Sequence, residues 1–252
     1  MMRGVVRGPC IPIALLILVA GLAVPVRAHA MHIAEGILPA GHAALWFLVS
    51  VPFVLWGLRE IRLRSAAAPH YKPFVALVGA AVFIISCMPI PVPIAGSCAH
   101  PVGTGLAAIL IGPAPAVVLA SIALALQALF MAHGGLTTLG ANVVAMGVAG
   151  AFSGYAIFLL ARRLGLPLLV AAFLAGLLSD WATYAATSAV LTVALHEPGG
   201  FSTMLQLILV AFMPTQVPLG ILEGVLAAGA LRFVQARMPV LIKGLQPTGG
   251  AV

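Results

Sequence analysis

Charged side chains are scarce in this chain: they make up 7% of its 252 residues, whereas 63% are hydrophobic. A soluble domain carries roughly a quarter charged residues, so the chain has too little charge to cover a surface that faces water. The alternating pattern of transmembrane β-strands is also missing, and the apolar runs approach the roughly 20 residues that a spanning helix needs. We therefore predict an all-α fold, a polytopic helical bundle whose solvent is mostly lipid.

Motifs for ATP hydrolysis and for zinc proteolysis are missing as well. No segment matches the phosphate-binding loop Gly-x-x-x-x-Gly-Lys-Ser/Thr, and no His-Glu-x-x-His pair occurs. Active accumulation of a substrate therefore requires a partner that supplies the energy. An intramembrane metalloenzyme and a self-sufficient permease are the competing interpretations. The first needs a general base beside an open metal position, and the second is favoured by an internal inverted repeat, which the sequence does not show.

The few basic residues lie in short clusters between the apolar runs, so the formal net charge of +7 does not form the basic stripe of a nucleic-acid-binding protein. Positive clusters between spans mark cytoplasmic loops. About seven predicted spans place every cluster, and the C-terminus, on the cytoplasmic side. The clusters are Arg59, Arg62, Arg64 and Lys72; Arg162 and Arg163; and Arg232, Arg237 and Lys243. The spans cover roughly residues 42–58, 73–90, 102–112, 114–131, 139–161, 166–195 and 203–231.

The N-terminal segment has the organisation of a cleavable signal peptide. A basic start is followed by an apolar stretch over residues 11–24 and by small residues at Ala28 and Ala30, where signal peptidase reads the chain. We predict cleavage before Met31, which exposes a new α-amine outside the cytoplasm. An uncleaved first helix is the alternative. Cleavage divides the chain into a signal peptide, 1–30, and a transmembrane domain, 31–252.

The predicted mature N-terminus offers nitrogen ligands for a metal ion. A free α-amine titrates near neutral pH, so a metal can displace its proton. The backbone nitrogen of His32 lies one chelate ring from the Met31 amine, and the His32 imidazole closes a second ring, which gives three nitrogens in one plane. His100 lies in a loop predicted on the same face and is the candidate for the fourth position. Amine and imidazole ligands favour Co²⁺, Ni²⁺, Cu²⁺ and Zn²⁺ over Mg²⁺ or Ca²⁺.

Two residues near this predicted centre have both a functional and a structural interpretation. His133 is on the same predicted face, where it can orient a ligand from outside the coordination sphere or simply stand in a turn beside two glycines. Glu35 follows the Met-His pair by three residues. Its carboxylate can hydrogen-bond nearby backbone and so fix the terminal segment.

Other polar residues fall inside the apolar runs or at one membrane face. Ionisable groups within spans are costly and usually face the protein interior, although helix–helix hydrogen bonding is their simpler explanation. A disulfide is possible between the cysteines if their face is periplasmic, and two unrelated small residues are the alternative. The span residues are Gln127, Asn142, Asp180 and Glu223, and the cysteines are Cys87 and Cys98.

Four ordered segments resemble signatures of the CbiM/NikM family, the substrate-capture (S) subunits of energy-coupling-factor cobalt and nickel importers. The resemblance covers nearly all of residues 31–235. The segments are Met31-His32-Ile33-Ala34-Glu35-Gly36; Gly96-Ser97-Cys98-Ala99-His100-Pro101-Val102-Gly103-Thr104-Gly105-Leu106; the run from Leu126-Gln127-Ala128-Leu129 through Ala132-His133-Gly134-Gly135-Leu136-Thr137-Thr138-Leu139-Gly140-Ala141-Asn142; and Pro218-Leu219-Gly220-Ile221-Leu222-Glu223-Gly224.

The resemblance implies a seven-helix fold with the N-terminal segment tucked into the bundle. It implies a metal ion bound by the Met31 amine, the His32 amide and imidazole, and the imidazole of His100. It also implies a bacterial inner membrane location and three kinds of partner: a transmembrane scaffold (T) subunit, ATPase (A) subunits and a small accessory membrane subunit. The Ser-Cys-x-His-Pro and Ala-His-Gly-Gly forms look like the cobalt branch more than the nickel branch, although Ala34 stands where cobalt-type members often carry Met. Co²⁺ is the expected substrate, and Ni²⁺ is the alternative.

Overall fold

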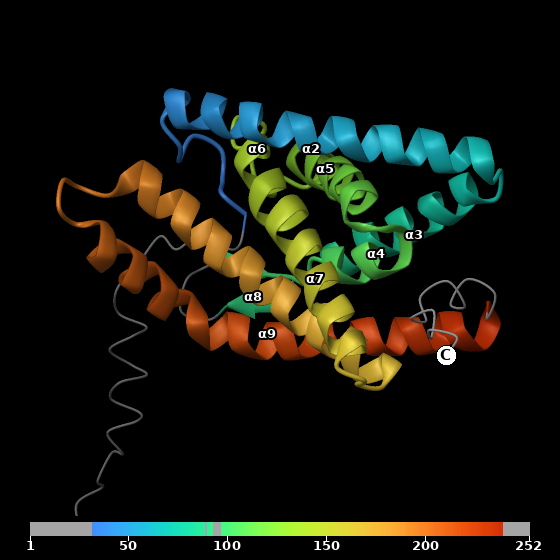
Figure 1. Ribbon diagram of the computed structural model, residues 1–252. Coiled ribbons are helices and arrows are strands. Elements are labelled where there is room, and N and C mark those ends of the chain that lie inside the picture. The colour runs from blue at the N-terminus through green and yellow to red at the C-terminus, as the bar shows by residue number, and fades with distance from the viewer. Residues whose placement is uncertain (1–31, 89, 93–96, 239–252) are drawn as a thin grey trace, which may run out of the picture.

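A computed structural model of the chain describes residues 32–88, 90–92 and 97–238 (Figure 1). The predicted signal peptide and Met31 lie outside these residues. The described part consists of apolar helices and one short hairpin. Its elements are α2 (Ala40–Ala67), α3 (Tyr71–Ser86), β1 (Ile90–Val92), β2 (Ser97–Ala99), α4 (Thr104–Ile111), α5 (Pro113–Phe130), α6 (Leu139–Asn142), the π-helix η1 (Val143–Ala149), α7 (Gly150–Arg163), α8 (Leu168–Leu195) and α9 (Phe201–Arg237).

The predicted spans correspond to these helices, with α6, η1 and α7 running as one segment over residues 139–163. The prediction of a polytopic membrane helical bundle is confirmed, because five of the described segments are long and apolar enough to cross a membrane. The span expected over 102–112 is shorter than predicted. Helix α4 has 8 residues, which cover roughly 12 Å at about 1.5 Å per residue, so α4 alone does not cross the hydrocarbon core.

Glycines set both ends of α4. Gly103 before the helix and Gly112 after it have φ angles of 72° and 95°, a region that favours glycine because other residues carry a Cβ atom. Pro113 then begins α5, where its missing N–H costs nothing. The chain therefore reverses sharply between α4 and α5. Upstream, the external loop predicted around Pro91–Pro101 contains an antiparallel β1–β2 hairpin, in which Ile90 pairs with Ala99.

Helix α4 lies at the centre of the bundle, with α2 along one side and α9 along the other (Figure 1). Apart from Leu110, every residue of α4 is buried. Small residues allow this close packing, as is common between membrane helices. A Cβ atom on Gly105 would lie 2.7 Å from the Ser179 side chain of α8, and one on Gly154 of α7 would lie 3.0 Å from the Gly105 backbone.

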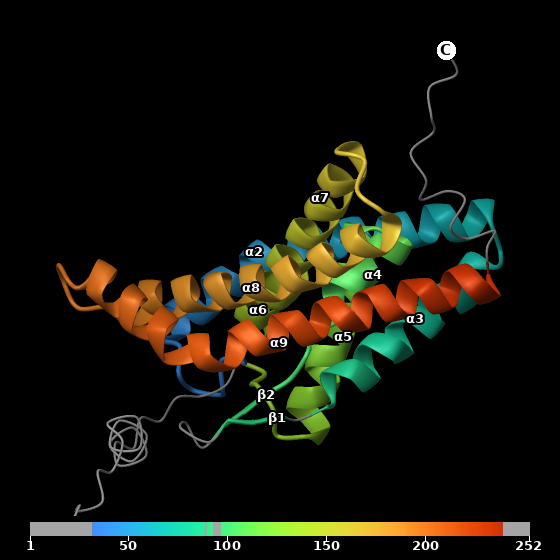
Figure 2. The ribbon, with the colours of Figure 1, turned by 90° about the horizontal axis from the view of Figure 1, so that it is seen from below.

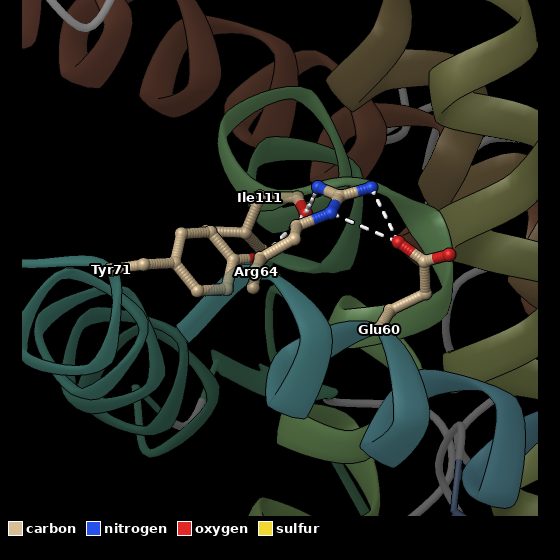
Figure 3. Close-up of polar contacts among 4 residues, drawn as sticks. All are labelled: Glu60, Arg64, Tyr71 and Ile111. Carbon is tan, nitrogen blue, oxygen red and sulfur yellow. Dashed lines mark hydrogen bonds and ion pairs between the residues drawn. The ribbon is translucent and has the colours of Figure 1, made fainter. Parts of the chain in front are cut away.

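Arg64, in the last turn of α2, fixes the C-terminal end of α4 (Figure 3). Its Nη1 donates to the Ile111 carbonyl at 2.8 Å, and the Tyr71 hydroxyl donates to the same oxygen at 3.1 Å. Glu60 pairs with Arg64 at 2.8 Å. A cation at a helix C-terminus satisfies carbonyls that have no partner in the helix. The other end of α4 follows His100, so this buried helix connects the segment of His100 to the contact with Arg64.

Candidate metal centre

Three histidines from distant parts of the sequence meet at one end of the bundle. One nitrogen each of His32, His100 and His133 lies within 4.8 Å of the other two. The ring centroid of His32 lies 4.4 Å from that of His133 and 4.7 Å from that of His100. His32 and His100 are buried, and His133 is partly buried. The chain thus brings together all three of the histidines that the sequence analysis assigned to this face.

The segment after His32 is held inside the bundle by its own backbone. The Ile33 N–H donates to Asn142 Oδ1 at 2.8 Å, and its carbonyl accepts from Asn142 Nδ2 at 3.1 Å and from Thr138 Oγ1 at 2.6 Å. Asn142 is the last residue of α6, and the π-helix η1 follows it directly. π-Helical turns are frequent at functional sites. Here the π-helix begins directly after the residue that anchors the N-terminal segment.

The loop between α5 and α6 packs against this N-terminal segment, and two glycines of the loop allow the two backbones to lie close together. A Cβ atom on Gly134 would lie 3.2 Å from the His32 ring, and one on Gly135 would lie 2.6 Å from the Glu35 Cα. The Glu35 carboxylate accepts the Thr137 N–H at 3.1 Å. Hydrogen bonding from Thr137 holds the pKa of Glu35 below its ordinary value. Glu35 therefore fixes the terminal segment to the loop, as its position in the sequence suggested.

Gln127 determines which nitrogen of His32 carries the proton. The Gln127 amide nitrogen donates to the carbonyl and the hydroxyl of Ser86, both at 3.0 Å. Because a carbonyl can only accept, the amide is oriented with its oxygen toward His32 Nε2, at 3.2 Å. The hydrogen bond therefore requires a proton on His32 Nε2. In the neutral ring, Nδ1 is then left with a free electron pair.

The backbone carbonyl of Pro101 does the same for His100. It lies 3.0 Å from His100 Nδ1, and because a carbonyl cannot donate, Nδ1 must carry the proton. His100 Nε2 is then the unprotonated nitrogen. A second contact of this kind, in which one ring nitrogen donates to a carbonyl, is a common way to orient a metal-binding histidine.

The two unprotonated nitrogens face each other. His100 Nε2 and His32 Nδ1 are 2.9 Å apart, and with the protons placed by Gln127 and Pro101 no hydrogen lies between them. Two electron pairs at this distance repel unless a cation joins them. An ion about 2.0–2.1 Å from each nitrogen, a usual metal–imidazole distance, would see them at an angle of about 90°. That angle is the one between neighbouring ligands of a tetragonal site.

Burial keeps these imidazoles neutral. Desolvation is the largest cause of the low pKa of His32, and neighbouring His100 and His133 lower it further. Burial also lowers the pKa of His100, to about 4, and that of His133. Metal binding requires neutral imidazole. At neutral pH the cluster therefore offers its nitrogens to an ion without first losing protons from the rings.

The other residues named from the sequence lie as follows. Met31 and the Cys98 side chain fall outside the described residues, so the terminal amine and the Cys87–Cys98 pair stay predictions. Cys87 contacts the Met131 sulfur at 3.5 Å. Asp180 on α8 and Glu223 on α9 are both buried, and Glu223 accepts the Gly103 N–H just before α4. Sequence reasoning gave no specific role to the two residues that hold the N-terminal segment, Gln127 and Asn142; their only signal is that they are polar residues within apolar runs.

Known proteins are similar to this chain in sequence and in fold. Residues 32–241 match the family model described as the cobalt uptake substrate-specific transmembrane region, CbiM. The chain is 56% identical over 216 residues to the cobalt transport protein CbiM of Sorangium cellulosum, covering 86% of this chain and 96% of that protein. It is 54% identical to the protein of the same name from Geobacter sulfurreducens, covering 88% of this chain and 65% of the other.

Solved structures agree with this relationship. A transition metal transporter superposes with a TM-score of 0.73 and 27% identity, covering 84% of this chain and 97% of its own. A truncated transition metal transporter gives a TM-score of 0.72 and 26% identity over 82% of this chain and 99% of its own. Together with a family match that spans most of the sequence, these likenesses show that the chain belongs to the CbiM family of cobalt uptake membrane proteins.

Proposed function

We propose that this protein is the substrate-capture subunit of an ATP-driven energy-coupling-factor importer, and that it binds Co²⁺ at the external face of the bacterial inner membrane. The observation that carries the proposal is the pair of unprotonated nitrogens, His32 Nδ1 and His100 Nε2, 2.9 Å apart. A buried arrangement of this kind is unfavourable until a cation joins the two electron pairs. Membership of a cobalt uptake family makes Co²⁺ the expected ion.

The mature N-terminus completes the ligand set. Cleavage after Ala30 leaves Met31 with a free amine, and the backbone nitrogen of His32 lies between that amine and the His32 imidazole. Nδ1 is the imidazole nitrogen that closes a six-membered ring with the amide, and it is the one that Gln127 leaves unprotonated. The ion displaces one proton from the amine and one from the amide. Two imidazoles, an amine and an amide anion then surround Co²⁺ in one plane.

Partners supply the energy. The chain contains no phosphate-binding loop, so ATPase (A) subunits, a transmembrane scaffold (T) subunit and a small accessory membrane subunit complete the importer. The basic clusters favour a cytoplasmic C-terminus and histidines on the external side. Arg64, which belongs to one of these clusters, then lies toward the cytoplasmic side, where the ATPase subunits work.

Two alternatives have clear discriminating features. A nickel-specific importer of the same family would use the same four nitrogens, so only the preference of the purified protein for Co²⁺ or Ni²⁺ separates the two. An intramembrane metalloenzyme needs a carboxylate base beside the ion. The buried carboxylate of Glu223 instead accepts the N–H groups of Val102 and Gly103, which disfavours that role.

Metal binding and uptake by matched histidine variants test the proposal. His100→Ala removes one of the two facing nitrogens and should abolish tight Co²⁺ binding while the protein still inserts into the membrane. His70→Ala is the control, because His70 is exposed in the turn between α2 and α3, far along the sequence from the cluster. Tight binding by His100→Ala would show that the fourth ligand is wrong. Purification of the tagged protein without any co-purifying ATPase subunit would refute the importer assignment.

A further inference from the structure

One peptide unit next to the metal centre is hydrogen-bonded at both ends. The carbonyl of Pro101 accepts from His100 Nδ1 at 3.0 Å. The N–H of the same peptide, which belongs to Val102, donates to Glu223 Oε2 at 3.3 Å. The next N–H, that of Gly103, donates to Glu223 Oε1 at 2.5 Å. A continuous chain of hydrogen bonds therefore runs from the His100 ring, through the Pro101–Val102 peptide, to a buried carboxyl group.

Helix packing places this carboxyl group. Glu223 lies on α9, which passes beside the β1–β2 hairpin that leads into His100 (Figure 2). Small residues bring α8 and α9 together around it: a Cβ atom on Gly176 would lie 2.7 Å from the Glu223 carbonyl, and one on Gly224 would lie 2.8 Å from the Phe173 carbonyl. Glu223 is 2% exposed. No water-facing role explains an ionisable group at this depth.

Glu223 is the ionised member of a buried acid pair. Its carboxyl group interacts with that of Asp180 on α8, and two buried carboxyl groups that interact closely do not both carry a charge. Glu223 accepts two backbone N–H groups, whereas neither oxygen of Asp180 accepts an N–H or O–H from any other described residue. Because hydrogen bonds from N–H donors stabilise the charged form, Asp180 holds the proton and Glu223 carries the charge.

We propose that Glu223 is a positioning residue that acts on the metal through the Pro101–Val102 peptide. Its negative charge polarises that peptide, so the Pro101 carbonyl becomes a stronger acceptor for the His100 Nδ1 proton. His100 is thereby held in the required tautomer, and its Nε2 becomes a better electron donor. Carboxylates that contact a metal-binding histidine directly have this effect. Here the peptide transmits it, and the inference rests on the proposed metal-capture function.

Acid-to-amide substitutions separate this role from general effects of charge and packing. Glu223→Gln keeps the size of the side chain and one acceptor but removes the charge. We expect it to weaken Co²⁺ binding by about 10–100-fold, the usual cost of losing a residue that orients a metal ligand. Asp180→Asn removes the second buried acid but leaves Glu223 its charge and its two N–H donors, so binding should change by less than about threefold. Glu197→Gln, on the exposed turn between α8 and α9, is the control for the chemical change.

A spectroscopic measurement distinguishes an effect on the ligand from a loss of packing. Cu²⁺ prefers tetragonal nitrogen sites and serves as the probe. A weaker His100 donor lowers the ligand field, so the d–d absorption of bound Cu²⁺ should move to longer wavelength in Glu223→Gln and stay at the wild-type position in Asp180→Asn. The melting temperature of the metal-free Glu223→Gln protein should stay within a few degrees of the wild type.

Each other outcome overturns the inference. Wild-type affinity in Glu223→Gln would show that the carboxylate does not act on the site, and equal losses in Glu223→Gln and Asp180→Asn would indicate a general effect of buried charge. A lower melting temperature with an unchanged Cu²⁺ spectrum would make Glu223 a packing residue. The proposed function fails separately: in that case the wild type does not bind Co²⁺, or His100→Ala binds it as tightly as the wild type does.

Discussion

Asn142→Ala tests whether the N-terminal segment must be docked for metal capture. The substitution removes the acceptor of the Ile33 N–H, at 2.8 Å, and one donor to the Ile33 carbonyl, at 3.1 Å. Thr138 still donates to that carbonyl, so the main loss is one buried N–H without a partner, which costs about 1–3 kcal/mol. In the proposed site, His32 binds metal only while the segment is docked. With tenfold in Kd for each 1.4 kcal/mol, the Kd for Co²⁺ should rise about 5- to 150-fold.

Competition with a chelator of known affinity, in detergent solution, measures this change. Ser153→Ala is the matched control: it removes a partly buried hydroxyl that donates to carbonyls of its own helical turn, those of Ala149 and Gly150. Its Kd should equal that of the wild type. A Kd for Asn142→Ala within a factor of two of the wild type would refute the reasoning, because docking through Ile33 would then contribute nothing to metal binding.

Two further predictions follow from the geometry around the cluster. Gly135→Ala places a Cβ atom 2.6 Å from the backbone of Glu35 and should weaken Co²⁺ binding more than tenfold, whereas Gly41→Ala meets nothing within 4 Å and should be neutral; equal affinities would contradict the packing. The pKa of His100 falls from an ordinary value of 6.5 to about 4 on folding, so the metal-free protein is stabilised above pH 6.5 and loses that stability as the pH falls toward 4. Its melting temperature should decrease across this range, and a constant value would contradict the burial of a neutral ring.

Charge placement and apolar runs predicted the arrangement of the bundle and the meeting of the histidines. Seven apolar segments and the positions of the positive clusters were enough to predict that His32, His100 and His133 lie at one end of the bundle. The reason is that topology decides which loops share a face. The length of α4 was not predictable in the same way. It depends on two glycines, Gly103 and Gly112, that adopt positive φ angles, and a hydropathy pattern does not distinguish them from glycines inside a helix.

The orientation of the ligands was also beyond the sequence. Gln127 and Asn142 were recognisable only as polar residues within spans, since the face that a residue presents depends on how the helices pack and on the π-helical turn after Asn142. The same holds for Glu223. Its contact with the Val102 N–H joins residues 121 positions apart, and no local pattern encodes such a contact.

X-ray absorption spectroscopy of the Co²⁺-loaded protein, purified after processing in its native membrane, tests the central claim most directly. The account predicts a planar shell of four nitrogens at about 2.0 Å, a usual metal–nitrogen distance, with the multiple scattering of two imidazoles. These two are His32 and His100, and the other nitrogens belong to the Met31 amine and the His32 amide. A tetrahedral shell, a sulfur ligand, or the scattering of three imidazoles, which would make His133 a ligand, would contradict it.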